Sequence, residues 1–189
     1  VLVLDIGAGT SEYAVYLNGS IRHCGVLAVG GEHVTNDLAV GLKLTQSRAE
    51  NLKLTHGSAV CGLSMAHRTV NYSRGVGMGD KQILIGDLHR IINVRLEELF
   101  LLVRADLEQK KLMGSISAGV LLSGGVARTP GINKLAQEIF RLNVLTSAEQ
   151  RADQDSRILR PETLAGIGLA QHAAKHFKAR GRRKRGFFK

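Results

Sequence analysis

Short apolar runs bounded by glycine open the chain and predict three strands. Residues 1–5, 12–17 and 21–29 have the length and the apolar content typical of strands. Between the second and third runs, Asn18-Gly19 is the dipeptide that favours a two-residue hairpin turn. A short glycine turn separates the first run from the second. We therefore expect the first two strands to run antiparallel, with the third continuing from the hairpin.

Helical periodicity begins directly after these strands. Gly30-Gly31 opens a predicted helix over residues 34–42, where apolar side chains recur at four-residue steps on one face. Ser47 and Glu50 have the spacing of a capping box, which predicts a second helix that ends at Gly57.

Residues 87–111 form the longest predicted helix. Its wet side carries Arg104/Glu108 and Asp106/Lys110 at the spacing of helical ion pairs. An apolar stripe along the opposite side predicts a face buried in the core. The residues of this stripe are Leu88, Ile92, Leu96, Leu99, Val103 and Leu107.

The remaining elements complete an alternating pattern. Residues 118–122 and 144–145 are predicted strands, residues 133–140 a helix, and residues 161–174 a final core helix with proline near its first turn. The whole order predicts an α/β lobe that carries a smaller insert at about residues 45–86.

Two glycine-rich turns that follow apolar strands carry the candidate chemistry. They are residues 5–12 (DIGAGTSE) and 122–131 (LSGGVARTPG). Strand ends rich in Gly, Ser and Thr expose backbone N–H groups that bind phosphate oxygens, so two of them predict a nucleotide site. The dinucleotide fingerprint is excluded because Glu12 stands where its last glycine is required, and the sequence has no P-loop. A third stretch, residues 74–79 (RGVGMG), is more typical of a plain turn.

Polar residues near these turns have two interpretations each. Asp5 is suited to holding Mg²⁺ through water beside a phosphate, or to capping local N–H groups in the turn. Thr10 and Ser11 add hydroxyls for phosphate contacts. Glu50 and Lys53, one helical turn apart, can reach a ribose or base, although their spacing alone favours an ordinary surface ion pair.

The net charge of +10 is concentrated at the C-terminal end. Residues 175–189 contain eight lysines and arginines and no acidic residue, which leaves residues 1–174 near neutral, at about +2. Such a tail predicts contact with an anionic surface, and a solvated charge run is the plain alternative. Two cysteines do not make a disulfide framework, so a reducing compartment is favoured. No apolar run approaches the roughly 20 residues of a membrane span, and no signal peptide is expected.

The glycine turns and the helices after them carry a family resemblance. Residues 5–12 are similar to the second phosphate loop of the actin/Hsp70/sugar-kinase superfamily, and residues 121–127 (LLSGGVA) to its adenosine loop. Within that superfamily, residues 29–42 (VGGEHVTNDLAVGL) and 48–53 (RAENLK) resemble the FtsA family of bacterial cell division proteins. Two shorter stretches agree with this resemblance: IINVRLEEL at 91–99 and TLAGIGLA at 163–170.

This resemblance implies an actin-like ATPase second domain, a ribonuclease-H-like lobe, with a smaller inserted α/β subdomain. Residues 1–44 and 87–174 would form the nucleotide-binding lobe. Residues 45–86, with the start of the 87–111 helix, would receive the C-terminal tail of the tubulin-like FtsZ, and residues 175–189 would be a basic membrane-targeting tail. The implied function is an ATP-binding tether that anchors the FtsZ ring, helps to assemble the divisome and polymerises when full-length. Its place would be the cytoplasmic face of the plasma membrane at the division site.

The resemblance also assigns residues to each partner. Those implied in binding ATP and Mg²⁺ are Asp5, Gly7, Gly9, Thr10, Ser11, Gly30, Gly31, Glu50, Lys53, Gly124, Gly125 and Val126, with Asp5 holding the metal through water. Contacts to the FtsZ tail are expected at Arg90 and Arg95. Those implied in membrane contact are Phe177, Lys178, Arg182, Arg183, Lys184, Arg185, Phe187 and Phe188.

Some features depart from the family, and they bear on activity. The family's first half, with its first phosphate loop, is missing, so we expect these 189 residues to bind ATP weakly and not to turn it over. Ala8 and Glu12 replace the usual Gly and Asp of the phosphate loop. The alternative is half of another actin-superfamily ATPase, such as a sugar kinase, a chaperone or a plasmid-segregation filament protein whose basic tail binds nucleic acid. Nucleic acid is not the partner that we favour.

Overall fold

The computed structural model describes residues 1–73, 80–146 and 160–185. The glycine stretch at 74–79 lies outside the described residues, as do Phe187 and Phe188 at the end of the tail. The predictions made for these positions are therefore left as they stand.

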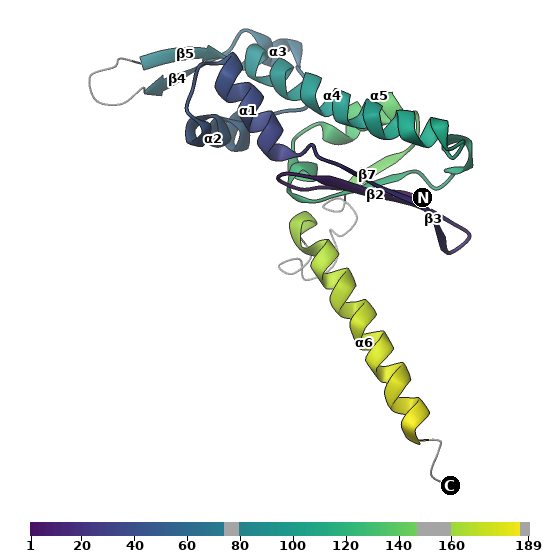
Figure 1. The fold of residues 1–189 in the computed structure, drawn as a ribbon. Helices are drawn as coiled ribbons and strands as arrows, with labels where there is room; N and C mark the ends of the chain where they lie inside the picture. Colours follow the sequence, from purple (N-terminus) through teal and green to yellow (C-terminus); the bar gives the residue numbers. More distant parts are fainter. Residues whose placement is uncertain (74–79, 147–159, 186–189) are drawn as a thin grey trace.

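A five-stranded sheet of order β3-β2-β1-β6-β7 is the centre of the fold (Figure 1). The three N-terminal strands, β1 (Leu2–Ile6), β2 (Ser11–Leu17) and β3 (Ser20–Leu27), pair antiparallel, as predicted. The later strands β6 (Val120–Ser123) and β7 (Val144–Thr146) run parallel to β1. The parallel pairing brings the carboxyl ends of β1 and β6 to the same edge of the sheet.

The hairpin between β2 and β3 has the predicted turn. Asn18 and Gly19 have φ values of 53° and 75°. Both positive angles are what a type I′ turn requires, and its twist matches that of the flanking strands.

Except for the last one, the principal helices lie on one face of the sheet (Figure 1). The principal helices are α1 (Gly31–Gly41), α2 (Gln46–His56), α4 (Ile85–Gln109), α5 (Ile132–Phe140) and α6 (Leu164–Arg185). Shorter elements are the helix α3 (Leu63–Ala66), the strands β4 (Thr69–Ser73) and β5 (Asp80–Leu84), and the 3₁₀ turns η1 (Met113–Ser115), η2 (Gly125–Arg128) and η4 (Pro161–Thr163).

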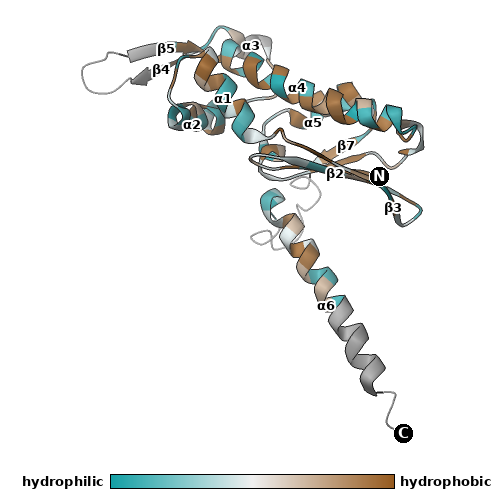
Figure 2. Cartoon of the chain, viewed as in Figure 1, coloured by the Kyte–Doolittle hydropathy of each residue, from teal (hydrophilic) through white to brown (hydrophobic). Residues whose placement is uncertain are grey.

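The apolar stripe predicted along the longest helix is confirmed as the main contribution to the core. All six of its residues on α4 are buried, facing the alternate residues Leu2, Leu4 and Ile6 of β1 within one cluster. Phe100 and Phe140 meet edge to face with ring centroids 5.6 Å apart, which fastens α4 to α5. Figure 2 shows hydrophobic residues gathered where α4 and α5 cover the sheet.

Two local predictions about helices are wrong because tertiary contacts redirect the side chains. The second helix begins at Gln46 with Thr45 at its N-cap, so Ser47 and Glu50 do not form a capping box. Glu50 turns instead toward α1. On α4, Asp106 was predicted to pair with Lys110 on the exposed side of the helix. It faces the sheet instead and accepts hydrogen bonds from the Tyr13 hydroxyl at 2.7 Å and from His23 Nε2 at 2.5 Å.

The final helix also differs from the prediction. Residues 161–163 form the 3₁₀ turn η4, and α6 then continues to Arg185, well beyond residue 174. It is no core helix, because it projects away from the sheet (Figure 1) and Leu169 on it is 71% exposed. None of the helices that the structure describes is both long and apolar enough to cross a membrane.

The range 45–86 contains a separate two-stranded sheet of β4 and β5. The helix α2 from the same range packs on α1. The division of the chain into a lobe and an insert stays a prediction.

Candidate functional site

A cavity of about 980 Å³ lies where the two glycine turns meet α1, α2 and α4. Half of the residues predicted to bind ATP line it: Gly7, Gly31, Glu50, Lys53, Gly125 and Val126. The cavity also contacts residues that the sequence did not single out, among them Thr35, Arg128 and Glu162.

The two turns come together because their strands are neighbours. Asp5 on β1 lies opposite Ser123 on β6 in the parallel register. Gly124 has a φ of +85°, and a Cβ placed on it would lie 2.6 Å from the Ile6 carbonyl carbon, and closer still to Ile6 O and Asp5 Oδ1. Only glycine permits this conformation and this approach, so Gly124 sets how closely the second turn packs on the first.

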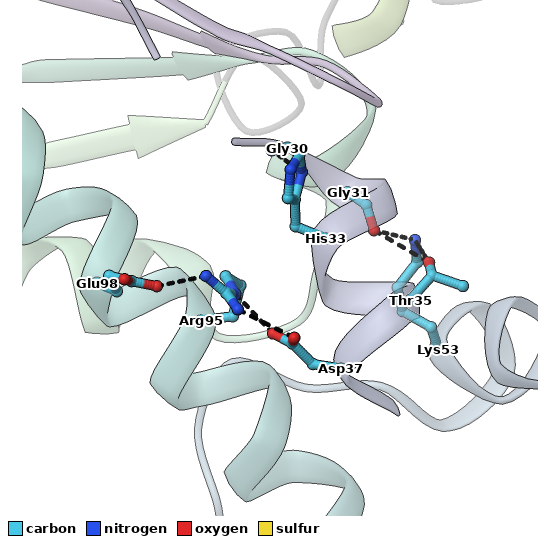
Figure 3. Close-up of polar contacts among 8 residues, drawn as sticks. All are labelled: Gly30, Gly31, His33, Thr35, Asp37, Lys53, Arg95 and Glu98. Atoms are coloured by element: carbon cyan, nitrogen blue, oxygen red, sulfur yellow. Dashed lines mark hydrogen bonds and ion pairs between the residues drawn. The ribbon is translucent and has the colours of Figure 1, made fainter. Parts of the chain in front are cut away.

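The start of α1 is joined to the first turn by its own backbone. Gly31 N–H donates to Gly7 O at 3.0 Å, and Glu32 N–H donates to Ala8 O at 2.8 Å. Gly30 N–H donates to His33 Nδ1 at 3.1 Å (Figure 3). All three N–H groups would otherwise be free at the helix N-terminus, and those of Gly31 and Glu32 hold the first turn against the helix.

Glycine is required at this junction for space. A Cβ on Gly30 would lie 2.5 Å from Ala8 O. On Gly31 it would lie 2.9 Å from Val126 Cγ2 and 3.5 Å from Lys53 Nζ. The two glycines therefore let α1, the first turn and the second turn converge around the cavity, whereas a Cβ on Gly125 would meet nothing within 4 Å.

Lys53 is the centre of a polar network on the cavity wall. Its Nζ donates to Gly31 O at 2.9 Å and to Thr35 Oγ1 at 2.7 Å (Figure 3). The same Nζ pairs with Glu50 Oε2 at 2.6 Å. The side chain of Lys53 is only 15% exposed, and the Thr35 hydroxyl also contacts Glu50. The pair is thus no ordinary surface ion pair.

The pKa of Glu50 reflects this network. Burial acts to raise the pKa, but hydrogen bonds from Lys53 and Thr35, with the charge of Lys53, outweigh it and leave the pKa below its ordinary range. The carboxylate therefore stays ionised and holds the Lys53 side chain beside the cavity.

Asp5 is half-buried beside the first turn, across from Glu12 in the β1–β2 register. Its pKa is raised by burial and by the charge of Glu12, against a hydrogen bond with Ser123. The Asp5 carboxylate, beside the charge of Glu12, would be stabilised by a cation, which fits Mg²⁺. The described residues hold no group of three or more His, Cys, Asp or Glu side chains arranged for a metal, so water and phosphate would supply most of its ligands.

The other residues of the two turns that were predicted to bind ATP do not line the cavity. Thr10 donates its hydroxyl to Glu12 Oε1 at 2.9 Å. Ser11 is buried and its hydroxyl donates to Val29 O at 2.7 Å. This bond joins the start of β2 to the segment between β3 and α1. Roles for Asp5, Gly9, Thr10, Ser11 and Gly124 in nucleotide binding stay predictions.

The two arginines predicted to bind a partner lie in different surroundings. Arg95 donates from Nε and Nη2 to the Asp37 carboxylate at 2.5 and 3.0 Å, and from Nη1 to Glu98 at 2.6 Å (Figure 3). The bonds that Arg95 donates to Asp37 tie α4 to α1, and this hydrogen bonding is the largest cause of the raised pKa of Arg95. Arg90 is 73% exposed and pairs with Asp87 one turn away. Arg90 is therefore the more accessible of the two.

The backbone of α6 carries the predicted membrane residues from Phe177 to Arg185. The residues that the prediction places on this helix are Phe177, Lys178, Arg182, Arg183, Lys184 and Arg185. Their contact with a membrane stays a prediction.

Reasoning from sequence missed several cavity residues, among them Thr35, Arg128 and Glu162. Thr35 lies one helical turn after Gly31, a spacing that could have pointed to it. Arg128 is the last residue of the 3₁₀ turn η2. Glu162 lies 34 positions after Arg128 and directly follows Pro161. No local pattern connects Arg128 with Glu162, since their contact arises only from the folded chain.

The mixed sheet and the paired glycine turns define an actin-like α/β fold. MreB5 of Spiroplasma citri bound to AMPPNP matches with a TM-score of 0.72 and 22% identity, over 95% of this chain and 55% of that one. The same protein bound to ADP matches with a TM-score of 0.65 and 25% identity, over 77% of this chain and 47% of that one. The predicted fold class is thus confirmed.

Sequence comparison narrows this class to one family. The family model of cell division protein FtsA matches residues 2–168. Cell division protein FtsA of Neisseria meningitidis serogroup B is 35% identical over 180 residues, which cover 93% of this chain and 43% of that protein. The chain belongs to the FtsA family. It spans less than half the length of this curated relative.

Proposed function

We propose that this chain is the nucleotide-binding half of an FtsA-like cell division protein, and that it binds ATP with Mg²⁺ in the cavity between the glycine turns. The observation that carries the proposal is the convergence of both turns and α1 on one cavity. The matching MreB5 structures hold AMPPNP and ADP, which supports a nucleotide as the ligand.

Residues of this chain would divide the work of binding. Lys53, fixed by Glu50 and Thr35, supplies a positive charge at the wall of the cavity. Gly125 leaves open space for the ligand to approach the second turn. Mg²⁺, when bound, neutralises phosphate charge, and the Asp5 carboxylate is the group of this chain suited to orient its waters. We propose binding without turnover by this chain alone.

The further roles proposed are those of a tether. The protein would anchor the FtsZ ring and help to assemble the divisome at the cytoplasmic face of the plasma membrane, with self-assembly in the full-length form. Arg90 is the exposed candidate for the FtsZ tail, because Arg95 already satisfies two carboxylates. The basic residues 175–189 would contact anionic lipid, at about 1 kcal/mol per charge near the surface.

Titration calorimetry with Mg·ATP tests the nucleotide proposal. The wild-type chain should bind, and Lys53→Met should weaken binding by at least about ten-fold, because it removes the fixed charge and leaves Glu50 unpaired at the wall. Lys134→Met, at an exposed lysine on α5, is the matched control and should bind as wild type. Equal affinity in the Lys53 and Lys134 variants would remove Lys53 from the site, and absence of any binding by wild type would reject the proposal.

A further inference from the structure

The C-terminal helix α6 starts from a short turn that is fastened to the cavity wall. Pro161, the first residue of the turn η4, is buried, and its carbonyl accepts a hydrogen bond of 3.0 Å from Gly124 N–H in the second glycine turn. Glu162 Oε1 lies 3.3 Å from Arg128 Nη1. Because α6 begins at Leu164, immediately after η4, no linker separates the helix from this attachment.

Both sides of this attachment border the cavity. Arg128 and Glu162 are lining residues, and the side chain of Glu162 is 34% exposed against 62% for Arg128. Their single contact at 3.3 Å is a weak, partly exposed ion pair, which exchanges readily with water. A ligand that fills the cavity would therefore lie against the second turn and η4 together.

Beyond its first turn, the part of α6 whose burial the structure describes is mostly exposed. Leu169 is 71% exposed, and the helix leaves the body of the molecule beyond its first turn (Figure 1). The contacts of η4 with Gly124 and Arg128 attach this helix to the cavity wall. A short element with few buried groups opens locally at a small cost in free energy.

We infer that the turn η4 couples occupancy of the cavity to the C-terminal helix: a nucleotide that contacts both Glu162 and the second glycine turn seats η4 and fixes α6. The inference rests on the proposed function, since it takes ATP as the ligand. A ligand that binds fully only when η4 is seated lowers the population of the unseated state by the factor 1 + [L]/Kd. By the reciprocity of linked equilibria, a chain with η4 loosened binds the ligand less tightly.

Hydrogen exchange of the whole 189-residue chain, read by mass spectrometry over residues 160–170, measures the seating of η4. At an ATP concentration of about ten times the Kd from calorimetry, exchange in this segment should slow by about ten-fold. Exchange in α5 serves as the internal reference. Binding heat without slower exchange in the segment overturns the inference alone. Absence of both heat and protection overturns the proposed function and the inference with it.

Variants separate seating from direct charge effects. Without ligand, Glu162→Gln and Arg128→Gln should each speed exchange of residues 160–170 by about two- to five-fold, and the double variant should do no more than either single one. Glu162→Gln should also weaken ATP binding. Simple charge repulsion predicts the opposite, because removing a carboxylate beside an anionic ligand strengthens binding. Tighter binding by Glu162→Gln, or unchanged exchange, would contradict the inference. Glu138→Gln, at an exposed position on α5, is the matched control.

Discussion

Replacing Gly124 by alanine should test how the two turns are joined more sharply than any other single change. The residue has φ +85° and ψ 170°, a region that is essentially restricted to glycine. Holding another residue there costs about 1–3 kcal/mol. The added methyl group would also lie 2.6 Å from the Ile6 carbonyl carbon, so β1 or the turn must move.

The strain and this displacement act together, and we expect Gly124→Ala to lower the free energy of unfolding by about 2–4 kcal/mol. Domains are stable by only about 5–15 kcal/mol, so this loss should be readily measured. The next residue provides the control: Gly125 lacks the positive φ, and a Cβ there meets nothing within 4 Å. Gly125→Ala should change the free energy of unfolding by less than about 1 kcal/mol.

Urea denaturation followed by circular dichroism gives both values. The midpoint should fall strongly for Gly124→Ala and little for Gly125→Ala, with equal slopes if both variants unfold in two states. Equal midpoints for the two variants would refute the reasoning, since they would mean that neither the backbone angle nor the approach of Ile6 limits the packing of the turns.

The remaining predictions concern α4 and the cavity wall. Arg95→Gln should lower the free energy of unfolding in urea titrations by about 1–2 kcal/mol, because Asp37 loses its bidentate partner. Arg90→Gln, at a 73% exposed site, should lower it by less than about 0.5 kcal/mol. Equal losses in the two variants would show that the Arg95–Asp37 bridge between α1 and α4 contributes nothing. The lowered pKa of Glu50 predicts a contribution to stability that is present at neutral pH. It begins to decrease below the ordinary glutamate pKa of about 4.3 and is lost as the pH falls through the lower folded-state pKa. Glu50→Gln should therefore flatten the fall in the unfolding midpoint between about pH 5 and pH 3, and an unchanged pH profile would contradict the assignment.

The parts of the fold that could be predicted are those set by local sequence. Asn18-Gly19 specifies its turn through its own backbone preferences, and the stripe from Leu88 to Leu107 specifies a buried face by spacing alone. Both were confirmed.

The parts that could not be predicted depend on approach between distant segments. Glu50 has the spacing of a cap, yet α1 packs beside it and offers Thr35, so the carboxylate turns there. At the start of α1, the N–H groups of Gly31 and Glu32 donate to the Gly7 and Ala8 carbonyls, a contact that no local pattern indicates. Such competition among partners follows from the tertiary structure and leaves no periodic signal.

The order in which the strands join the sheet has a consequence for synthesis of the chain. Leu2 of β1 pairs with Val15 on one side and with Val120 on the other. The three N-terminal strands can therefore form early, while the second side of β1 has no partner until β6 is made, more than a hundred residues later. At bacterial elongation rates of up to about 20 residues per second, that edge remains open for at least about six seconds. During this time the open edge of β1 is where a nascent chain would need protection from pairing with a neighbour.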